Sequence, residues 1–400
     1  MGNIDIIEPR WFTQWTIWLG VVCLAGFNVI TWSLTVMNLL LVALLIPCSS
    51  GYINDFSINI TYPGIEDEDN TRVFLVDTFG TDDFIWHADE YSKLVGAERT
   101  YDEKKSSSYY DPGREYEFKY VDENKESCYL EGSAAFDQVE LLPYLRRTVE
   151  FGMVKSATCG NDAIKRSTSF NGKLRAGKVS FRQFVTQTVG KTLAEAFRNR
   201  QLCLHISVSE DMKIKQTVVA VGAAYNKARH INEAFNHKEY MWALPTTYFK
   251  VGRHRYEPGY NRLAVFMSAY DKIKLPWPYF DQIVEESEAK YDNASGKYLV
   301  DCGRELHLEL GIEKGEFKIP FHALLRRRNP QDSQCELLLE HWPERYIEDV
   351  HLGIPFFVNN GVCFYYLNGA ASISFYNATY DENSPIFPNT FGTYMSVVNE

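Results

Sequence analysis

Short apolar runs separated by turn residues make up most of the chain after residue 55. Ten of these runs are rich in β-branched and aromatic residues, at positions 56–62, 72–77, 115–121, 202–209, 217–225, 262–267, 297–302, 306–312, 362–367 and 371–380. Such runs are typical of β-strands. Many short strands at moderate spacing predict a largely β protein.

Helical periodicity is limited to two stretches, residues 181–199 and 277–291, where apolar positions recur every three or four residues. The stretch from about Ser209 to Asn236 is polar and holds one strand pattern. We therefore predict a boundary near residue 225, with lobes at residues 51–225 and 226–400.

The first 50 residues form a hydrophobic leader. No charged side chain occurs from Trp11 to Asn54, which exceeds the roughly 20 residues that cross a bilayer. Arg10 precedes the run and tryptophans crowd its start, as at a membrane interface. One interpretation is thus a retained anchor that contacts the membrane through residues 11–46.

A second interpretation is a cleaved signal peptide that starts at Met37. A short apolar region follows this methionine and ends in the small residues Ser49, Ser50 and Gly51. Residues 1–36 would then be an upstream extension, and the mature protein would be soluble. Both interpretations place the rest of the chain outside the cell or in the secretory or endolysosomal lumen.

Glycosylation and disulfides are expected in such a compartment. Asn59, Asn293 and Asn377 each begin an Asn-x-Ser/Thr triplet. Cys23 and Cys48 fall in the leader, which leaves Cys128, Cys159, Cys203, Cys302, Cys335 and Cys363. An even number of cysteines suggests disulfides, although the residues alone leave their pairing open.

Composition and charge narrow the function classes. The chain of 400 residues is 45% hydrophobic and 14% aromatic, as expected of a folded protein, and its net charge is −11. Nucleic-acid binding needs a clustered basic surface, so we expect no nucleic-acid partner. The basic run Arg326 to Arg328 is interpreted as a solvated loop, and scattered histidines predict no metal site.

Several motifs follow one another in a recognisable order. In the first half they are INITYP, VFLVDTFGT, a tryptophan at 86, TYDEKKSSSYY, FKYVDENKESCYLEG and VEFGMVKSAT; in the second half they are TVVAVGAAY, EYMWALP, KYLVDC and HLGIPFFVNNGVCFYYLNGAASISF. Together they resemble the pepsin-like aspartic protease family over nearly everything after residue 50. The resemblance implies an all-β, bilobal pepsin-like fold with a few short helices. It also implies a flap tyrosine at Tyr120 and a disulfide between Cys302 and Cys335.

The first catalytic loop of the family resembles residues 77–81. Asp77 and Thr78 match its aspartate and hydroxyl, but Phe79 stands before Gly80 where the glycine is expected. A bulky residue in place of a glycine that allows unusual backbone angles predicts a reshaped turn.

The second catalytic loop lacks its aspartate. When the family's proline is placed on Pro276, the aspartate position holds Met267, and Ser268, Ala269 and Tyr270 follow. Methionine has no proton to give and only a weakly accepting sulfur. Asp271 lies four residues later; we interpret it as a solvated loop carboxylate, and its use as a repositioned catalyst is the alternative.

Aspartic proteolysis needs two carboxylates that share a proton and hold one water. We therefore expect a pepsin-fold protein in which Asp77 is no longer catalytic, with an inter-lobe cleft that binds a peptide or protein. The alternatives are an active divergent aspartic endopeptidase and a cell-surface interaction protein with a collapsed cleft. No cofactor is expected, and the oligomeric state stays open.

Overall fold

The computed structural model describes most of the chain between residues 56 and 397. The described residues are 56–65, 70–78, 84–95, 100–121, 127–142, 145–160, 164, 172–175, 201–208, 214–221, 230–235, 241–257, 262–313, 315–327, 331–342, 349–367, 370–379 and 393–397. The leader and the helix predicted at residues 181–199 lie outside this set. Among the described residues, no helix is long and apolar enough to cross a membrane.

Strands dominate the described residues, as predicted. Each of the ten apolar runs contains a strand. The first part of the chain forms a large mixed β-sheet. Its strand order is β1-β2-β8-β3-β7-β6-β5, and β4 pairs with β3. Its strands are β1 (Ser57–Thr61), β2 (Thr71–Asp77), β3 (Phe84–His87), β4 (Thr100–Tyr101), β5 (Glu115–Val121), β6 (Ser127–Leu142), β7 (Leu145–Ala157) and β8 (Gly172–Arg175).

A fully buried aspartate supports this first sheet. Asp137 on β6 accepts a hydrogen bond of 2.6 Å from the Tyr101 hydroxyl and another from the Ser108 hydroxyl. Burial, followed by the hydrogen bond to Asp137, raises the pKa of Tyr101 far above its usual range. Tyr101 therefore stays neutral and donates a hydrogen bond to the Asp137 carboxylate.

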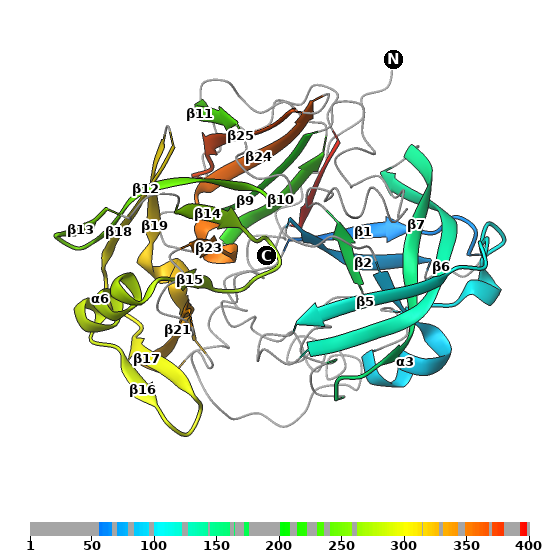
Figure 1. Cartoon of the computed structure of the whole chain (residues 1–400), viewed down its shortest axis with the longest axis horizontal. Coiled ribbons are helices and arrows are strands. Elements are labelled where there is room, and N and C mark those ends of the chain that lie inside the picture. The colour runs from blue at the N-terminus through cyan, green and yellow to red at the C-terminus, as the bar shows by residue number, and fades with distance from the viewer. Residues whose placement is uncertain are drawn as a thin grey trace, which may run out of the picture. The chain divides into compact units, whose positions relative to one another are not determined.

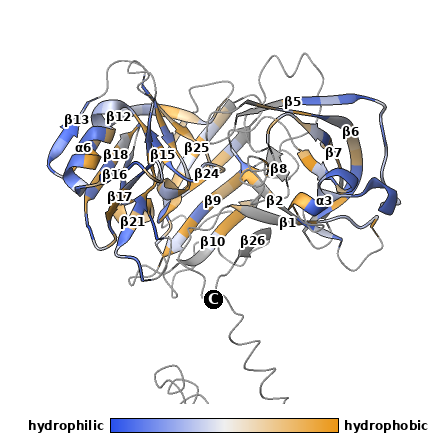
Figure 2. Cartoon of the chain, turned by 90° about the horizontal axis from the view of Figure 1, so that it is seen from below, coloured by the Kyte–Doolittle hydropathy of each residue, from blue (hydrophilic) through white to orange (hydrophobic). Residues whose placement is uncertain are grey.

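A six-stranded sheet contains strands that precede residue 225 and strands that follow it. Its order is β11-β25-β24-β9-β10-β26, with β9 (Gln201–Val208), β10 (Ile214–Val221), β11 (His230–Phe235), β24 (Asn360–Leu367), β25 (Ala370–Asn377) and β26 (Thr393–Val397). Every residue of β9 is buried, and Figure 2 shows hydrophobic residues gathered along β9 and β10. The lobe boundary at residue 225 stays a prediction.

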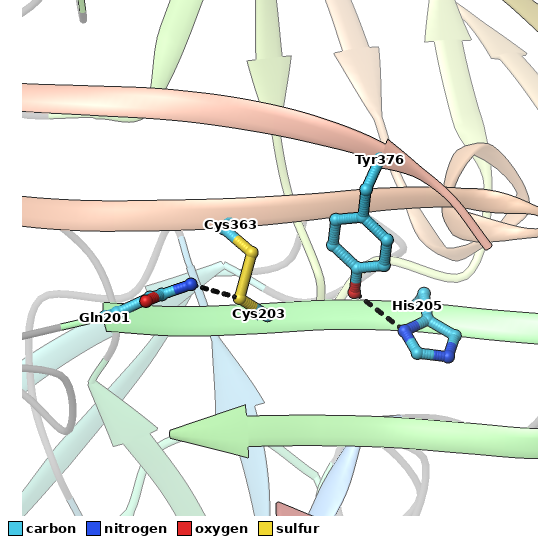
Figure 3. Close-up of a disulfide and its surroundings, with 5 residues drawn as sticks. All are labelled: Gln201, Cys203, His205, Cys363 and Tyr376. Carbon is cyan, nitrogen blue, oxygen red and sulfur yellow. Dashed lines mark hydrogen bonds between the residues drawn. A yellow bond between two sulfur atoms is a disulfide. The ribbon is translucent and has the colours of Figure 1, made fainter. Parts of the chain in front are cut away.

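Three buried polar side chains of β9, those of Gln201, His205 and Ser207, have hydrogen-bond partners. Figure 3 shows the Tyr376 hydroxyl on β25 directed at His205 Nδ1 on β9, at 2.7 Å, and Gln201 Nε2 pointing at the Cys203 sulfur. Ser207 donates to the carbonyl of Ala378 over 2.7 Å. Because buried polar groups are costly without hydrogen bonds, these contacts explain how polar residues fit a strand that is buried throughout.

Two further sheets occupy the second part of the chain (Figure 1). The larger has the order β19-β18-β12-β14-β23-β15-β22 with β13 beside β12, and the smaller has the order β16-β17-β21-β20. The strands are β12 (Ala243–Val251), β13 (His254–Tyr256), β14 (Leu263–Phe266), β15 (Ile273–Leu275), β16 (Lys290–Asp292), β17 (Lys297–Asp301), β18 (His307–Ile312), β19 (Gly315–Pro320), β20 (Leu325–Arg326), β21 (Gln334–Leu337), β22 (Leu339–His341) and β23 (Val350–Leu352).

The described α-helices are α3 (Ala88–Val95), which the sequence pattern did not predict, and α6 (Trp277–Ser287). The prediction of a helix through residue 291 was too long. Glu288 adopts a left-handed conformation with φ 57°, and its N–H bonds to the carbonyls of Val284 and Glu285. A left-handed residue ends an α-helix, and the chain continues as β16.

Three disulfides join the described cysteines: Cys128–Cys159, Cys203–Cys363 and Cys302–Cys335. The last is the pair that the family resemblance implies. The first two settle the pairing that the residues alone left open. Cys203 and Cys363 lie directly opposite each other on β9 and β24, so this disulfide crosses two neighbouring strands of the six-stranded sheet.

Candidate functional site

The strands β2 and β14 carry the two loops that matter for chemistry. Asp77 is the last residue of β2 and is 6% exposed, and Thr78 after it is fully buried. β14 ends at Phe266, and Met267 and Ser268 follow. Both strands lie inside larger sheets, so each loop starts from a fixed point.

The two loops are joined by four hydrogen bonds, which we call the cross-brace (Val76, Thr78, Phe266 and Ser268). The Thr78 hydroxyl donates to the Phe266 carbonyl over 2.8 Å and accepts the Ser268 N–H over 2.9 Å. The Ser268 hydroxyl donates to the Val76 carbonyl over 2.5 Å and accepts the Thr78 N–H over 2.9 Å. Each hydroxyl therefore bonds to the other loop in the same way, and the arrangement has local twofold symmetry.

The symmetry of the cross-brace defines which residues correspond. Asp77 immediately precedes Thr78, and Met267 immediately precedes Ser268. Met267 therefore stands where the symmetry of the loops places the counterpart of Asp77. The Met267 side chain is half-buried and packs beside Ala243, Leu263 and Val265.

Backbone contacts hold the second loop in place. The Met267 N–H donates to the Leu352 carbonyl over 2.9 Å, and the Tyr270 N–H closes a turn on the Met267 carbonyl over 3.1 Å. A Cβ atom on Gly353 would lie only 2.0 Å from the Lys272 carbonyl oxygen and 2.3 Å from that of Tyr270. A glycine is required at position 353 because the loop passes directly over it.

Asp271 is not a solvated loop carboxylate, and that interpretation was wrong. The Arg326 guanidinium donates to Asp271 Oδ2, and both side chains are about three-quarters buried. The interpretation of Arg326 as part of a solvated loop was wrong for the same reason, because Arg326 belongs to β20 and pairs with this carboxylate. The sequence pattern does not indicate that Arg326 and Asp271, which are 55 residues apart, form an ion pair in the folded chain.

The residues on either side of Asp271 are also anchored. The Tyr270 hydroxyl donates to Glu340 Oε2 over 2.5 Å, and Lys272 Nζ bonds to Glu340 Oε1 over 3.2 Å. Burial opposes the charge on Lys272, but the carboxylates of Glu340 and Asp271 outweigh it and hold the pKa of Lys272 above its usual value. The loop that follows Met267 is thus tied to β20 and β22 by charged side chains.

The remaining predicted site residues are spread over the fold. Tyr120 lies on β5 opposite Cys128, although its side chain is not among those described, and Phe79 and Gly80 lie outside the described residues. Asn59 lies on β1. Asn293, in the turn after β16, and Asn377, the last residue of β25, are exposed. Among the described side chains, no group of three or more His, Cys, Asp or Glu could hold a metal ion.

The protein has a two-lobed β fold, and two hydrogen-bonded loops join the lobes. The first loop contains the sequence Asp77-Thr78. These features are those of a domain of the aspartic-protease class. A model of the eukaryotic aspartyl protease family matches residues 68–365, about three quarters of the chain. The chain belongs to the eukaryotic aspartyl protease family. A comparison with curated proteins finds no match.

Proposed function

We propose that this protein is a non-catalytic member of the aspartyl protease family that binds a peptide or protein between its lobes. The observation that carries the proposal is that Met267 precedes Ser268 of the cross-brace just as Asp77 precedes Thr78. A water held between two carboxylates needs an acid and a base, and a thioether can serve as neither. Where catalytic groups act as a unit, the loss of one commonly lowers the rate by about 10⁴ to 10⁶.

The retained cross-brace supports a binding role. Its hydrogen bonds are buried, and each contributes on the order of 0.5–1.5 kcal/mol. The brace keeps the two loops adjacent although one carboxylate is missing. The surfaces of the two lobes on either side of the loops therefore keep a fixed geometry. Peptide binding depends on this geometry and does not require the carboxylate of Asp77.

The alternative is a divergent endopeptidase in which Asp271 replaces the missing aspartate. The buried Asp77 at the end of β2 favours it. The pairing of Asp271 with Arg326 counts against it, because a carboxylate held by a guanidinium would have to leave that partner to share a proton with Asp77.

A cleavage assay separates the two. Purified protein is incubated with a denatured protein substrate between about pH 3 and 5, where a carboxylate dyad holds one proton, and circular dichroism verifies that it stays folded. We expect no cleavage that pepstatin inhibits. Pepstatin-sensitive cleavage that Asp77→Asn abolishes would overturn the proposal, and its loss in Asp271→Asn would identify the second carboxylate.

A selection from a displayed peptide library tests the binding role. We expect peptides to be enriched, with affinities that fall at least about tenfold in Thr78→Ala, which removes one hydroxyl of the cross-brace. Lys290→Met, on the exposed side of β16, is the matched control and should bind normally. If no peptide is enriched, the binding role is wrong and the alternative of a collapsed cleft with an interaction surface elsewhere is favoured.

We further propose that the domain is a glycoprotein of the cell exterior or of the secretory or endolysosomal lumen. Three disulfides support this because such bonds persist in oxidising compartments. The exposure of Asn293 and Asn377 makes both accessible to a glycan. Expression in secretory cells should give a protein whose mass falls on deglycosylation, and Asn293→Gln and Asn377→Gln should each remove one glycan. An unmodified protein with free thiols would contradict the assignment.

A further inference from the structure

A hollow of about 310 Å³ lies in the second part of the chain, away from the cross-brace. Helix α6, the hairpin of β16 and β17, and the strands β21 and β22 supply its lining, and none of Asp77, Thr78, Met267 and Ser268 belongs to it. Its volume is at the lower end of the range of small-molecule sites. A second hollow of about 230 Å³ shares Glu336 with it.

Two lysine–glutamate pairs line the hollow. Lys297 Nζ lies 2.7 Å from Glu336 Oε2, and Lys272 Nζ lies 3.2 Å from Glu340 Oε1. The Glu336 side chain is only 3% exposed. An ammonium has three donors and a carboxylate accepts several hydrogen bonds, so each pair can still engage a ligand. The hollow therefore offers positive and negative groups in equal number.

Aromatic rings form the apolar part of the lining. Phe280 of α6 meets Tyr298 of β17 edge to face at 5.2 Å, and Tyr291 of β16 meets Tyr298 at 5.1 Å. Phe280 is only 1% exposed and supports Tyr298 from within the core, whereas Tyr291 and Tyr298 present ring faces and edges that suit another aromatic side chain. The apolar and charged groups are thus neighbours within one small space.

His341 adds a group whose orientation is fixed. Its ring stacks on Trp277 with centroids 3.6 Å apart, and its Nδ1 donates to the Trp342 carbonyl over 2.9 Å. Since this hydrogen bond uses Nδ1, any contact of the ring with a ligand is made through Nε2.

We propose that this hollow binds a free α-amino acid with an aromatic side chain. The ligand carboxylate bonds to Lys297 and Lys272, its ammonium bonds to Glu336 and Glu340, and its ring packs against Tyr291 and Tyr298. An anion or a cation alone would meet one matching and one repelling charge in each pair. A zwitterion matches both charges of a pair. Its carboxylate and its ammonium are attached to the same carbon atom, so they can face the lysine and the glutamate at the same time.

Titration of the intact protein with three probes tests the chemistry. L-phenylalanine carries both charges, N-acetyl-L-phenylalanine lacks the ammonium, and L-phenylalaninamide lacks the carboxylate. We expect calorimetry to show binding of L-phenylalanine that is at least about tenfold tighter than that of either analogue, because each analogue loses a charge-assisted contact. Equal affinities for the three probes, tighter binding of an analogue, or no binding of L-phenylalanine at about 10 mM would overturn the proposal.

A charge-neutral double variant tests the location. Lys297→Met with Glu336→Gln removes one pair without leaving a buried charge alone, and it should weaken L-phenylalanine binding at least about tenfold. Lys290→Met on the same hairpin is the matched control and should bind as the unmodified chain does. Normal binding by a folded double variant would place the ligand elsewhere and refute the assignment. These results are independent of the cleavage assay, which reports on Asp77.

Discussion

At the scale of single residues, the hydroxyls of Thr78 and Ser268 explain more of this site than the carboxylate of Asp77 does. Each hydroxyl makes two hydrogen bonds across loops that are 190 residues apart in sequence. In the second loop, the residue that corresponds to Asp77 is Met267, whose side chain is a thioether. The hydrogen bonds that hold the two loops together therefore do not depend on a catalytic carboxylate.

Replacement of Thr78 by valine should destabilise the protein by about 2–5 kcal/mol, because the buried Ser268 N–H and Phe266 carbonyl would both lose a partner. Thr247→Val, an exposed position on β12, is the matched control and should change stability by less than about 0.5 kcal/mol. Urea unfolding measures both. Equal stability of the two variants would show that the cross-brace contributes little.

His351 on β23 should make the protein sensitive to acid. Burial, followed by the nearby charge of Lys274, lowers its pKa from 6.5 to about 3. The unfolded chain therefore takes up a proton at a higher pH than the folded protein does, and stability falls as the pH decreases from 6.5 towards 3. His351→Phe should lose less stability over this interval, by up to about 4 kcal/mol, as thermal unfolding at several pH values would show. An unchanged pH profile would contradict this.

At the scale of elements, both ends of α6 have a local cause. α6 begins directly after Pro276, buries Tyr279, Phe280 and Ile283 on one face, and ends at the left-handed Glu288. The apolar spacing continues to residue 291, but backbone geometry stops the helix first. The apolar pattern therefore predicted the presence and start of α6 correctly and its end incorrectly.

Glu288→Gly should stabilise the protein by about 0.5–1 kcal/mol, since glycine adopts φ 57° without the strain of a side chain. Glu285→Gly, exposed inside the same helix, should destabilise it by about 1 kcal/mol. Thermal unfolding of the pair gives the comparison. The loss of the exposed contact between Glu288 and Arg304 should matter little. Destabilisation by both variants would show that the left-handed turn does not limit α6.

At the scale of the whole molecule, the six-stranded sheet joins parts of the chain that are far apart in sequence. β9 and β10 pair with β24 and β26, and the Cys203–Cys363 disulfide closes a loop of 160 residues. The Cys302–Cys335 disulfide closes a loop of 33 residues within the second part of the chain.

Loss of Cys203–Cys363 should therefore cost more stability than loss of Cys302–Cys335. In the chain-entropy model the two bonds contribute about 5 and about 4 kcal/mol. Urea unfolding of Cys203→Ala with Cys363→Ala, against Cys302→Ala with Cys335→Ala, compares them. A smaller loss for the first pair would mean that the six-stranded sheet is already held together by its packing.

The amino-acid order was sufficient for features that depend on neighbours in the chain. Short apolar runs located the strands, and the interval to Pro276 predicts that Met267 occupies the position of the missing aspartate. The disulfide partners of Cys128 and Cys203, the contact of Asp271 with Arg326, the cross-brace and the hollow that α6 helps to line emerged only from the folded chain. Each of these depends on residues that are brought together from distant positions, and short-range periodicity carries no information about which distant partner the packing will select.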